Sequence, residues 1–242
     1  MEHTENKTAI VVGASGAIGE AMVSRFMEDP SYKSVVAVSR QASVSAPGRL
    51  IWKQTDHSDA SITDIAAQLG SLEPDVHRVV MCPGMLHGAT IQPEKMLEHL
   101  DAAAMQRIFS VNVVIPALWL RSLTPLFKAS EAVVAVLSAR VGSITDNRAG
   151  GWYSYRSSKA ALNMLMKSAS IELRRRAPGV KLLAFHPGTT DSHLSQPFQR
   201  NVAPEKLFTP QFVAQRLSTI MDDSKCDGEL DFVDWEGKTI PW

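Results

Sequence analysis

Residues 7–26 read KTAIVVGASGAIGEAMVSRF, and this stretch guides the interpretation of the whole chain. The apolar run 9–12 ends at a glycine, which predicts a short β-strand buried on both faces. Apolar residues then recur at helical spacing from Ile18 to Phe26, so a helix is expected almost directly after the strand. The stretch therefore predicts a strand, a tight turn and a helix.

Three glycines lie in the predicted turn. Glycines here allow the backbone to turn tightly, to approach a pyrophosphate and to pack the helix against the strand. Unpartnered N–H groups at the start of the helix would then face the phosphates. The alternative is a turn that merely needs small residues, and the rest of the chain must decide between the two. The residues expected to contact a dinucleotide are Gly13, Ser15, Gly16, Ala17, Ile18 and Gly19.

The composition suits one domain that acts on a small molecule. The chain has 242 residues, 45% of them hydrophobic, which fits a single α/β domain over 1–242. Lys plus Arg and Asp plus Glu both number 25, so no net field favours nucleic acid or an anionic membrane. Cys82 and Cys226 form no C-x-x-C motif, residues 1–7 do not resemble a signal peptide, and no apolar run is expected to span a bilayer. A cytoplasmic location is the expectation.

Strands alternate with helices along the rest of the chain. This order predicts a Rossmann-type fold, which is a doubly wound parallel sheet. Ligands in such sheets bind beyond the carboxyl ends of the strands. The further strands are expected at 34–39, 50–54, 77–82, 131–138, 180–185 and 230–233, and the further helices from near residue 60, at 101–123, from 153 to 176 and at 211–221.

Arg40 directly follows the second expected strand, beside the place of the adenosine ribose. A carboxylate there would accept from a 2′-hydroxyl, whereas a guanidinium suits a 2′-phosphate. No Asp or Glu stands in that place, so the sequence favours NADP(H) over NAD(H), with an ordinary solvated arginine as the alternative. Asp56 ends the third strand and could accept from the adenine amino group, while Ser58 or Asp59 caps the next helix.

Asn112 lies on the apolar stripe of the helix expected at 101–123. Pro116 follows four residues later and has no N–H, so it cannot donate to the carbonyl oxygen of Asn112. A bend is expected there. The freed carbonyl is available to a water molecule, or else the bend serves packing alone.

Four features in this order resemble the short-chain dehydrogenase/reductase superfamily over nearly the full chain. They are the glycine turn, Asn112, Tyr155-x-x-x-Lys159 and Pro187-Gly188. The resemblance implies a nicotinamide cofactor and an enzyme that interconverts a carbonyl and an alcohol by hydride transfer.

Within the superfamily, residues 138–163 and 234–242 resemble the C-factor-like branch. That branch is named for cell–cell signalling. A nucleotide-binding signalling or regulatory protein with little turnover is therefore the alternative function.

The resemblance also implies roles for individual residues. Tyr155 would donate a proton to the substrate carbonyl, and Lys159 would lower the tyrosine pKa and hold the nicotinamide ribose. A phenol titrates near pH 10, so a nearby ammonium that favours the phenolate is chemically sensible. Asn112 would hold a relay water. The remaining cofactor contacts are expected from Pro83, Gly84, Pro187, Gly188, Thr190 and Ser192.

The sequence departs from the family pattern at two places. The usual Asn-Asn-Ala-Gly after the fourth strand is Met-Cys-Pro-Gly at 81–84, and the usual serine position falls on Ala139. Ser138 and Ser143 are the candidates for the catalytic serine, and one of them is expected to serve. The intact Tyr155, Lys159 and Asn112 favour chemistry over pure binding.

The substrate and assembly leave weaker traces in the sequence. A pocket lined by Arg140, Trp152, His193 and Phe198 would suit an aromatic or partly anionic carbonyl compound. The seven histidines form no ligand-spaced pair, so no metal is expected. The helices at 101–123 and 155–176 carry more apolar surface than one sheet face covers, and the family pairs them across subunits. A homodimer or homotetramer is therefore expected.

Overall fold

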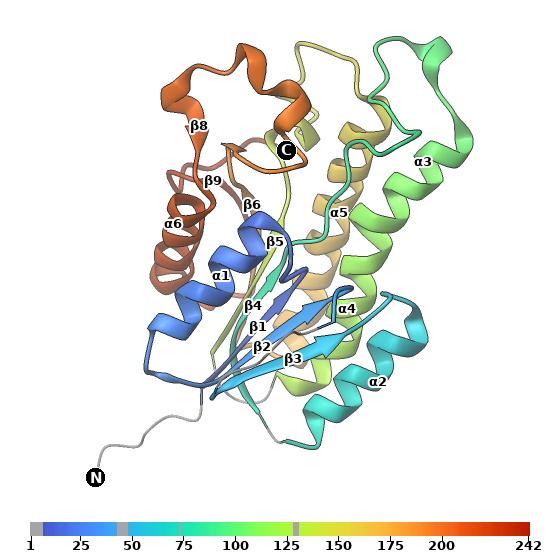
Figure 1. The fold of residues 1–242 in the computed structure, drawn as a ribbon. Coiled ribbons are helices and arrows are strands. Elements are labelled where there is room, and N and C mark those ends of the chain that lie inside the picture. Colours follow the sequence, from blue (N-terminus) through green and yellow to red (C-terminus); the bar gives the residue numbers. More distant parts are fainter. Residues whose placement is uncertain (1–6, 43–47, 73, 128–130) are drawn as a thin grey trace.

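The structure is a computed structural model that describes residues 7–42, 48–72, 74–127 and 131–242, so residues 1–6, on which the expected location partly rests, lie outside it. Within the described residues, seven parallel strands form one sheet in the order β3-β2-β1-β4-β5-β6-β9 (Figure 1). The strands are β1 (Lys7–Val12), β2 (Tyr32–Ser39), β3 (Leu50–Gln54), β4 (Asp75–Met81), β5 (Ala132–Leu137), β6 (Val180–His186) and β9 (Leu230–Asp234). This order confirms the doubly wound Rossmann-type sheet.

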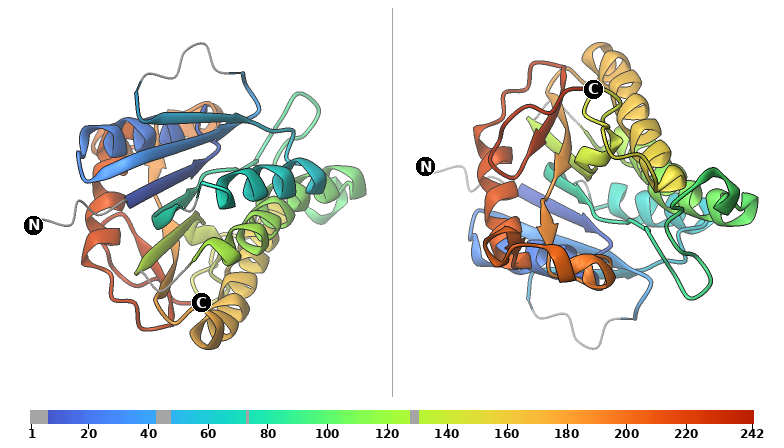
Figure 2. Two further views of the ribbon diagram at one scale, coloured as in Figure 1. Left: turned by 90° about the horizontal axis from the view of Figure 1, so that it is seen from below. Right: turned by 90° about the horizontal axis from the view of Figure 1, so that it is seen from above.

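Helices cover both faces of the sheet. One face is covered by α1 and α6, which lie side by side, and the other by α2, α4 and α5 (Figure 2). Residues 9–12 of β1 are fully buried between these layers, as the apolar run predicts. The helices are α1 (Ala17–Glu28), α2 (Asp59–Gly70), α3 (Ala102–Phe109), α4 (Ile115–Leu123), α5 (Tyr153–Arg176) and α6 (Pro210–Asp223).

The sheet grows outward in both directions from β1, which pairs with β2 on one side and β4 on the other. Val12 is in register with Val38 and Met81 at the carboxyl ends of these strands. The connections on the two sides leave in opposite directions, which opens a crevice above β1. The glycine turn enters this crevice directly.

The helix expected at 101–123 is interrupted. A π-helical turn, Ser110–Val114, separates α3 from α4 and contains Asn112. The proline near the start of α4 has no N–H, so the regular bonding pattern cannot pass through this point. The sequence predicts a bend at Asn112, and the structure shows a wider, π-helical turn there.

The sequence predicts that no apolar segment could span a bilayer, and this expectation is wrong. The helical segment Ala102–Leu126 is long enough and apolar enough to do so, and 28% of its apolar window is buried in this chain. One such helix is weak evidence for a membrane span, because core helices of soluble proteins pass the same test. The molecule therefore carries a partly uncovered apolar helix on its α4–α5 side.

The segment between β6 and α6 has more structure than a loop. It contains a short parallel pair, β7 (Thr189–Thr190) with β8 (Leu207–Phe208), and two 3-10 turns, Gln196–Asn201 and Pro204–Lys206. Figure 1 shows it arching over the carboxyl ends of the strands. The remaining 3-10 turns are Leu97–His99, Thr124–Leu126 and Arg140–Gly142.

Candidate active site

The glycine turn has the geometry that a bound diphosphate requires. Gly13 has φ of +82°, a conformation that disfavours any side chain. An added Cβ at Gly19 would lie 2.2 Å from the carbonyl oxygen of Gly13, so the helix packs against the strand without space for a methyl group. Gly16 precedes α1, and no side chain caps the first N–H groups of that helix. These N–H groups are available to an anion.

A cleft of about 610 Å³ lies beyond the carboxyl ends of the strands. It brings together most of the residues that the sequence predicts for the site: Gly16, Ala17, Ile18, Gly19, Arg40, Gly84, Ser138, Tyr155, Lys159, Pro187, Gly188, Thr190, Ser192 and also Trp152, His193 and Phe198. The predicted residues Gly13, Ser15, Asp56, Pro83, Asn112, Ser143 and Arg140 are not among the residues that line it.

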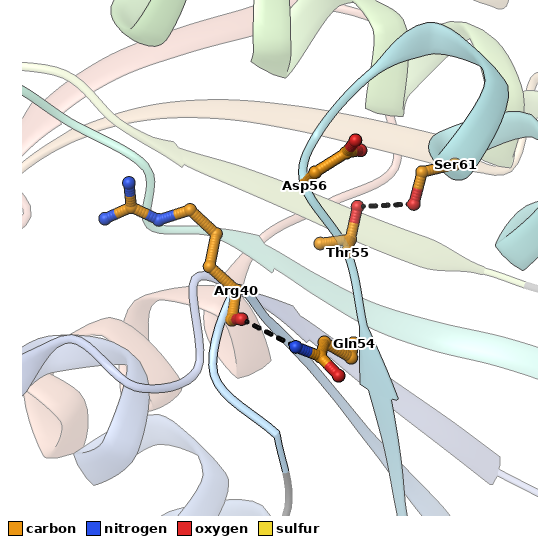
Figure 3. Close-up of a pocket in the computed structure, with 5 residues that line it drawn as sticks. All are labelled: Arg40, Gln54, Thr55, Asp56 and Ser61. Carbon is orange, nitrogen blue, oxygen red and sulfur yellow. Dashed lines mark hydrogen bonds between the residues drawn. The ribbon is translucent and has the colours of Figure 1, made fainter.

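A second hollow of about 440 Å³ shares Arg40 with the cleft and contains Asp56. Figure 3 shows the Arg40 guanidinium extending away from the other four lining residues. It has no ion-pair partner among the described residues. Gln54 Nε2 donates to the Arg40 carbonyl oxygen at 3.2 Å, and Thr55 and Ser61 join their hydroxyls at 3.0 Å. The rim of the hollow therefore carries a guanidinium that has no ion pair among the described residues, which is the kind of group that binds a phosphate.

One oxygen of the Asp56 carboxylate is occupied within its own turn. Its Oδ1 accepts from the Ser58 N–H at 2.8 Å, and these hydrogen bonds from Ser58 hold the pKa of Asp56 below its usual value. The Ser58 hydroxyl in turn caps α2 by accepting from the Ser61 N–H, so Ser58 and not Asp59 is the cap. The remaining Asp56 oxygen is exposed to the hollow.

Tyr155 and Lys159 lie one turn apart at the start of α5, both buried. The Lys159 ammonium donates to the Leu137 carbonyl oxygen at 2.7 Å and lies 5.7 Å from the centre of the Tyr155 ring. Burial lowers the pKa of Lys159 to about 8. The expectation that Lys159 lowers the tyrosine pKa is wrong for this structure, because burial raises the pKa of Tyr155. Near neutral pH, the site therefore holds a protonated phenol beside a cation.

The turn Arg140–Gly142 packs closely on α5 at this point. An added Cβ at Gly142 would lie 2.7 Å from the Cβ of Lys159, so only glycine allows the turn to approach the helix so closely. The position of the Lys159 stem is therefore fixed from both ends, by Gly142 and by the bond to Leu137.

The Asn112 side chain joins two parts of the site. Its Oδ1 accepts from the Met85 N–H at 2.7 Å, and its Nδ2 donates to the Met85 carbonyl oxygen and to Ser158 Oγ, both at 2.9 Å. Ser158 Oγ donates in turn to the Tyr155 carbonyl oxygen at 2.7 Å. The amide thus ties the loop after β4 to the helix that carries Tyr155. The relay water expected at Asn112 would hydrogen-bond to the backbone carbonyl oxygen of this residue. This water stays a prediction.

The two serine candidates lie in different places. The Ser138 hydroxyl lines the cleft but donates to Asn163 Oδ1 at 2.6 Å. The Ser143 hydroxyl accepts from the Asp146 N–H at 3.0 Å, away from the cleft lining. Ala139 stands between them in the sequence, lines the cleft and packs against Tyr155.

Aromatic side chains form the end of the cleft next to Tyr155. The Trp152 ring lies 6.3 Å from the Tyr155 ring and 5.1 Å from the Phe198 ring. Trp152 has φ of +52° and follows two glycines that both have φ of +64°, so an unusual run of left-handed residues places the indole. Leu86 and Leu194 complete the apolar wall and were not predicted from the sequence.

Arg140 does not contribute a cation to this end of the cleft. Its guanidinium forms ion pairs with Asp146 and Asp234, both at 3.0 Å. The expectation that Arg140 lines the pocket is wrong, because its guanidinium pairs with these two carboxylates and Arg140 is not among the residues that line the cleft. The expectation of a partly anionic substrate loses the support of Arg140, while His193 still lines the cleft.

Two buried polar atoms beside the cleft lack a partner within the described structure. They are Thr190 Oγ1 and His186 Nδ1, and both residues line the cleft. Burial and the nearby Arg140 lower the pKa of His186 to about 4, so the ring is neutral near pH 7. Such buried atoms normally pair with something. A carboxamide that offers both a donor and an acceptor fits this wall.

Glu94 is a residue that sequence reasoning missed. Its carboxylate is buried and accepts from both the N–H and the hydroxyl of Ser154, and its carbonyl oxygen accepts from the Trp152 N–H at 2.6 Å. It therefore holds the residues directly before Tyr155. No local pattern marks it, because its partners lie about sixty residues further along the chain.

The sheet order, the open helix start and the cleft define a Rossmann-type dinucleotide-binding domain. The family model for short chain dehydrogenases matches residues 7–203, and the chain belongs to this family. The protein is accordingly an oxidoreductase that uses a nicotinamide cofactor. No group of three His, Cys, Asp or Glu side chains in the described ranges is arranged to hold a metal.

Two relatives extend the comparison. The chain is 28% identical over 237 residues to 1-hydroxy-2-glutathionyl-2-methyl-3-butene dehydrogenase of Rhodococcus sp. (strain AD45), covering 97% of this chain and 99% of the relative. It is 31% identical over 147 residues to the C-signal of Myxococcus xanthus, covering 60% of this chain and 83% of the relative. The resemblance to a C-factor-like relative is thereby confirmed.

Among solved structures, the NADPH-bound carbonyl reductase from chicken fatty liver superposes with a TM-score of 0.80 at 22% identity, covering 97% of this chain and 94% of that chain. At this level of identity the match supports the fold.

Proposed function

We propose that the protein is an NADP(H)-dependent carbonyl reductase or alcohol dehydrogenase in which Tyr155 transfers the proton. The observation that carries the proposal is the pair of Tyr155 and Lys159, buried together at the cleft between the glycine turn and the aromatic end. A protein that only binds a nucleotide has no need of a phenol and an ammonium held in this way.

Three groups of residues in this chain would each bind a different part of the cofactor. Arg40 and its hollow would hold the 2′-phosphate, and the open start of α1 after Gly16 would hold the diphosphate. Thr190, whose buried hydroxyl has no partner among the described residues, would bind the carboxamide. The nicotinamide, when bound, supplies or accepts the hydride.

The proton transfer follows from burial and charge. The raised pKa keeps the Tyr155 phenol protonated near pH 7, so it can donate to a carbonyl oxygen as the hydride arrives. The Lys159 ammonium, with a pKa of about 8, is still charged and stabilises the phenolate that remains. In the oxidative direction the Tyr155 phenolate would accept the proton, and the Lys159 ammonium would stabilise the phenolate beforehand.

The NADP(H) preference rests on Arg40. Its guanidinium is free of ion pairs within the described residues, and no carboxylate at the end of β2 competes for a ribose hydroxyl. The structural neighbour from chicken was solved with NADPH bound, which supports the same preference.

A homodimer or homotetramer is part of the proposal. Apolar side chains remain exposed on the π turn and on α5, namely Val114, Met164 and Ile171. Pairing of these faces between two copies would cover them. A cytoplasmic location, without nucleic acid or membrane partners, likewise stays a prediction.

The test is reduction of a panel of aldehydes, ketones and quinones with NADPH and with NADH. We expect turnover with at least one carbonyl class and a lower KM for NADPH. The alternative, a signalling or regulatory protein, is favoured only by the C-signal relative. Tight NADPH binding without turnover on any carbonyl in the panel would support that alternative.

A further inference from the structure

Hydride addition to a substrate carbonyl, the reaction of the proposed function on which this inference rests, moves the π electron pair onto the carbonyl oxygen. The Tyr155 proton then neutralises this oxygen. Preorganised donors aimed at the developing charge lower the barrier. The rate of hydride transfer should therefore depend on how many hydrogen-bond donors the cleft presents to the carbonyl oxygen.

Ala139 occupies the wall next to the phenol. It lines the cleft and packs against Tyr155 in one apolar cluster with Leu86. An alanine side chain has no hydrogen to donate.

Neither neighbouring serine replaces the missing donor. The Ser138 hydroxyl has one proton, which it donates to Asn163 Oδ1 at 2.6 Å in a buried setting. Ser143 lies outside the cleft lining. The other bonded hydroxyls of the cleft, Ser192 and Ser195, donate to the Thr190 carbonyl oxygen on the segment after β6.

The aromatic end of the cleft adds a second constraint. The Trp152 ring lies 5.1 Å from Phe198 in a tilted arrangement and 6.3 Å from Tyr155 edge-on, so a substrate ring that enters this end of the cleft would meet aromatic side chains. The described lining contains no Asp or Glu, and its only Arg and Lys are Arg40 and Lys159. Both cations have other tasks, so the described lining leaves no further arginine or lysine to pair with a substrate carboxylate.

We propose that Ala139 removes one hydroxyl donor from the wall beside Tyr155, and that the enzyme therefore selects neutral aryl carbonyl compounds that are electronically activated. Aryl α-diketones and aryl ketones with electron-withdrawing substituents belong to this class. Their carbon accepts hydride with less external stabilisation of the oxygen. Ala139 is thus a specificity-determining residue.

The experiment measures single-turnover hydride transfer from NADPH to para-substituted acetophenones, from methoxy to nitro. In the parent, the rate should rise steeply with electron withdrawal. In Ala139→Ser the slope should be smaller. The added hydroxyl should raise the rate with the methoxy ketone by about tenfold to a hundredfold, which is part of the rate effect of one well-placed donor to a developing oxyanion. Ala139→Cys adds similar volume with a much weaker donor and should keep a slope near the parent's.

Two results would overturn the inference. One is an equal slope in the parent and Ala139→Ser. The other is a loss of about a hundredfold or more in Ser138→Ala, which would make Ser138 the second donor. NADPH binding without hydride transfer to any member of the series would instead count against the proposed function itself.

The aryl preference has its own control. The ratio of kcat/KM for acetophenone over cyclohexyl methyl ketone should fall about threefold to tenfold in Trp152→Leu. Phe212→Leu changes a ring that packs with Phe208 and Trp235 outside the cleft lining, and should leave this ratio in place. An unchanged ratio in Trp152→Leu would overturn the aryl part of the inference.

Discussion

The Glu94 carboxylate accepts two hydrogen bonds from Ser154, one from its N–H and one from its hydroxyl, directly before Tyr155 in the chain. The same residue accepts from the Trp152 N–H through its backbone. A negative charge also suits the start of α5, where N–H groups lack helical partners. Glu94 is therefore a positioning residue for both the phenol and the indole.

Glu94→Ala should lower the free energy of unfolding by about 1–3 kcal/mol, because it leaves buried donors of Ser154 unpaired. It should also lower kcat more than it weakens NADPH binding, since the phenol loses its support while the glycine turn is untouched. Glu94→Gln should recover part of both losses. Kinetics and urea unfolding provide the measurements.

Glu98→Ala is the matched control, because Glu98 is an exposed acid on the nearby 3-10 turn Leu97–His99. A kcat as low in Glu98→Ala as in Glu94→Ala would show that the effect is not specific to the Ser154 contact.

Arg40→Asp should narrow or reverse the preference for NADPH over NADH. A charge-assisted bond to phosphate is worth about 1.5–3 kcal/mol, or roughly tenfold to a hundredfold in affinity. The dissociation constants of both cofactors, measured by fluorescence titration, test this. Equal affinities in the parent protein would remove the basis of the argument from Arg40.

Gly19→Ala and Gly16→Ala should differ in kind. The added Cβ at Gly19 would lie 2.2 Å from the Gly13 carbonyl oxygen, so the turn must shift and the melting temperature should fall. At Gly16 the added Cβ meets only the Gly13 carbonyl oxygen at 3.4 Å, an ordinary contact. This variant should keep its stability and lose cofactor affinity, because its methyl group enters the cleft. Equal melting temperatures would contradict the close packing at Gly19.

The buried Lys159 should make stability depend on pH. Its pKa is about 8 in the folded chain and 10.5 when unfolded, so between these values the unfolded state binds more protons. Stability from this group therefore increases as pH rises from about 8 to about 10.5. Urea unfolding of the parent relative to Lys159→Met should show the difference increasing over this window. A flat difference would mean that Lys159 keeps an ordinary pKa.

The sequence predicted the parts of the site that depend on local pattern. The glycine turn follows from steric limits, and the pairing of Tyr155 with Lys159 follows from helical spacing. An irregularity of the helix near Asn112 was foreseeable because a proline removes one donor, but its form as a π turn was not. These features are decided within a few residues of the chain.

Features that depend on distant contacts were not predictable in this way. The partner of Arg140, Asp234, lies on β9, at the edge of the sheet, and the contact of Glu94 requires the loop after β4 to fold back onto α5. The sequence also left undecided which of Ser138 and Ser143 faces the cleft, because a shift of one residue along the chain changes which side chain points there.

The most direct test of the proposed chemistry is the rate of hydride transfer in Tyr155→Phe, measured in a single turnover with NADPH and with NADPD so that the isotope effect identifies the chemical step. The ring that packs beside Trp152 is kept and only the hydroxyl is lost. We predict nearly unchanged NADPH affinity and a loss of about 10²–10⁴-fold in hydride transfer, whereas Lys159→Ala should lose both turnover and part of the NADPH affinity. Hydride transfer at the parent rate in Tyr155→Phe, with a full isotope effect, would contradict the assignment of Tyr155 as the proton donor.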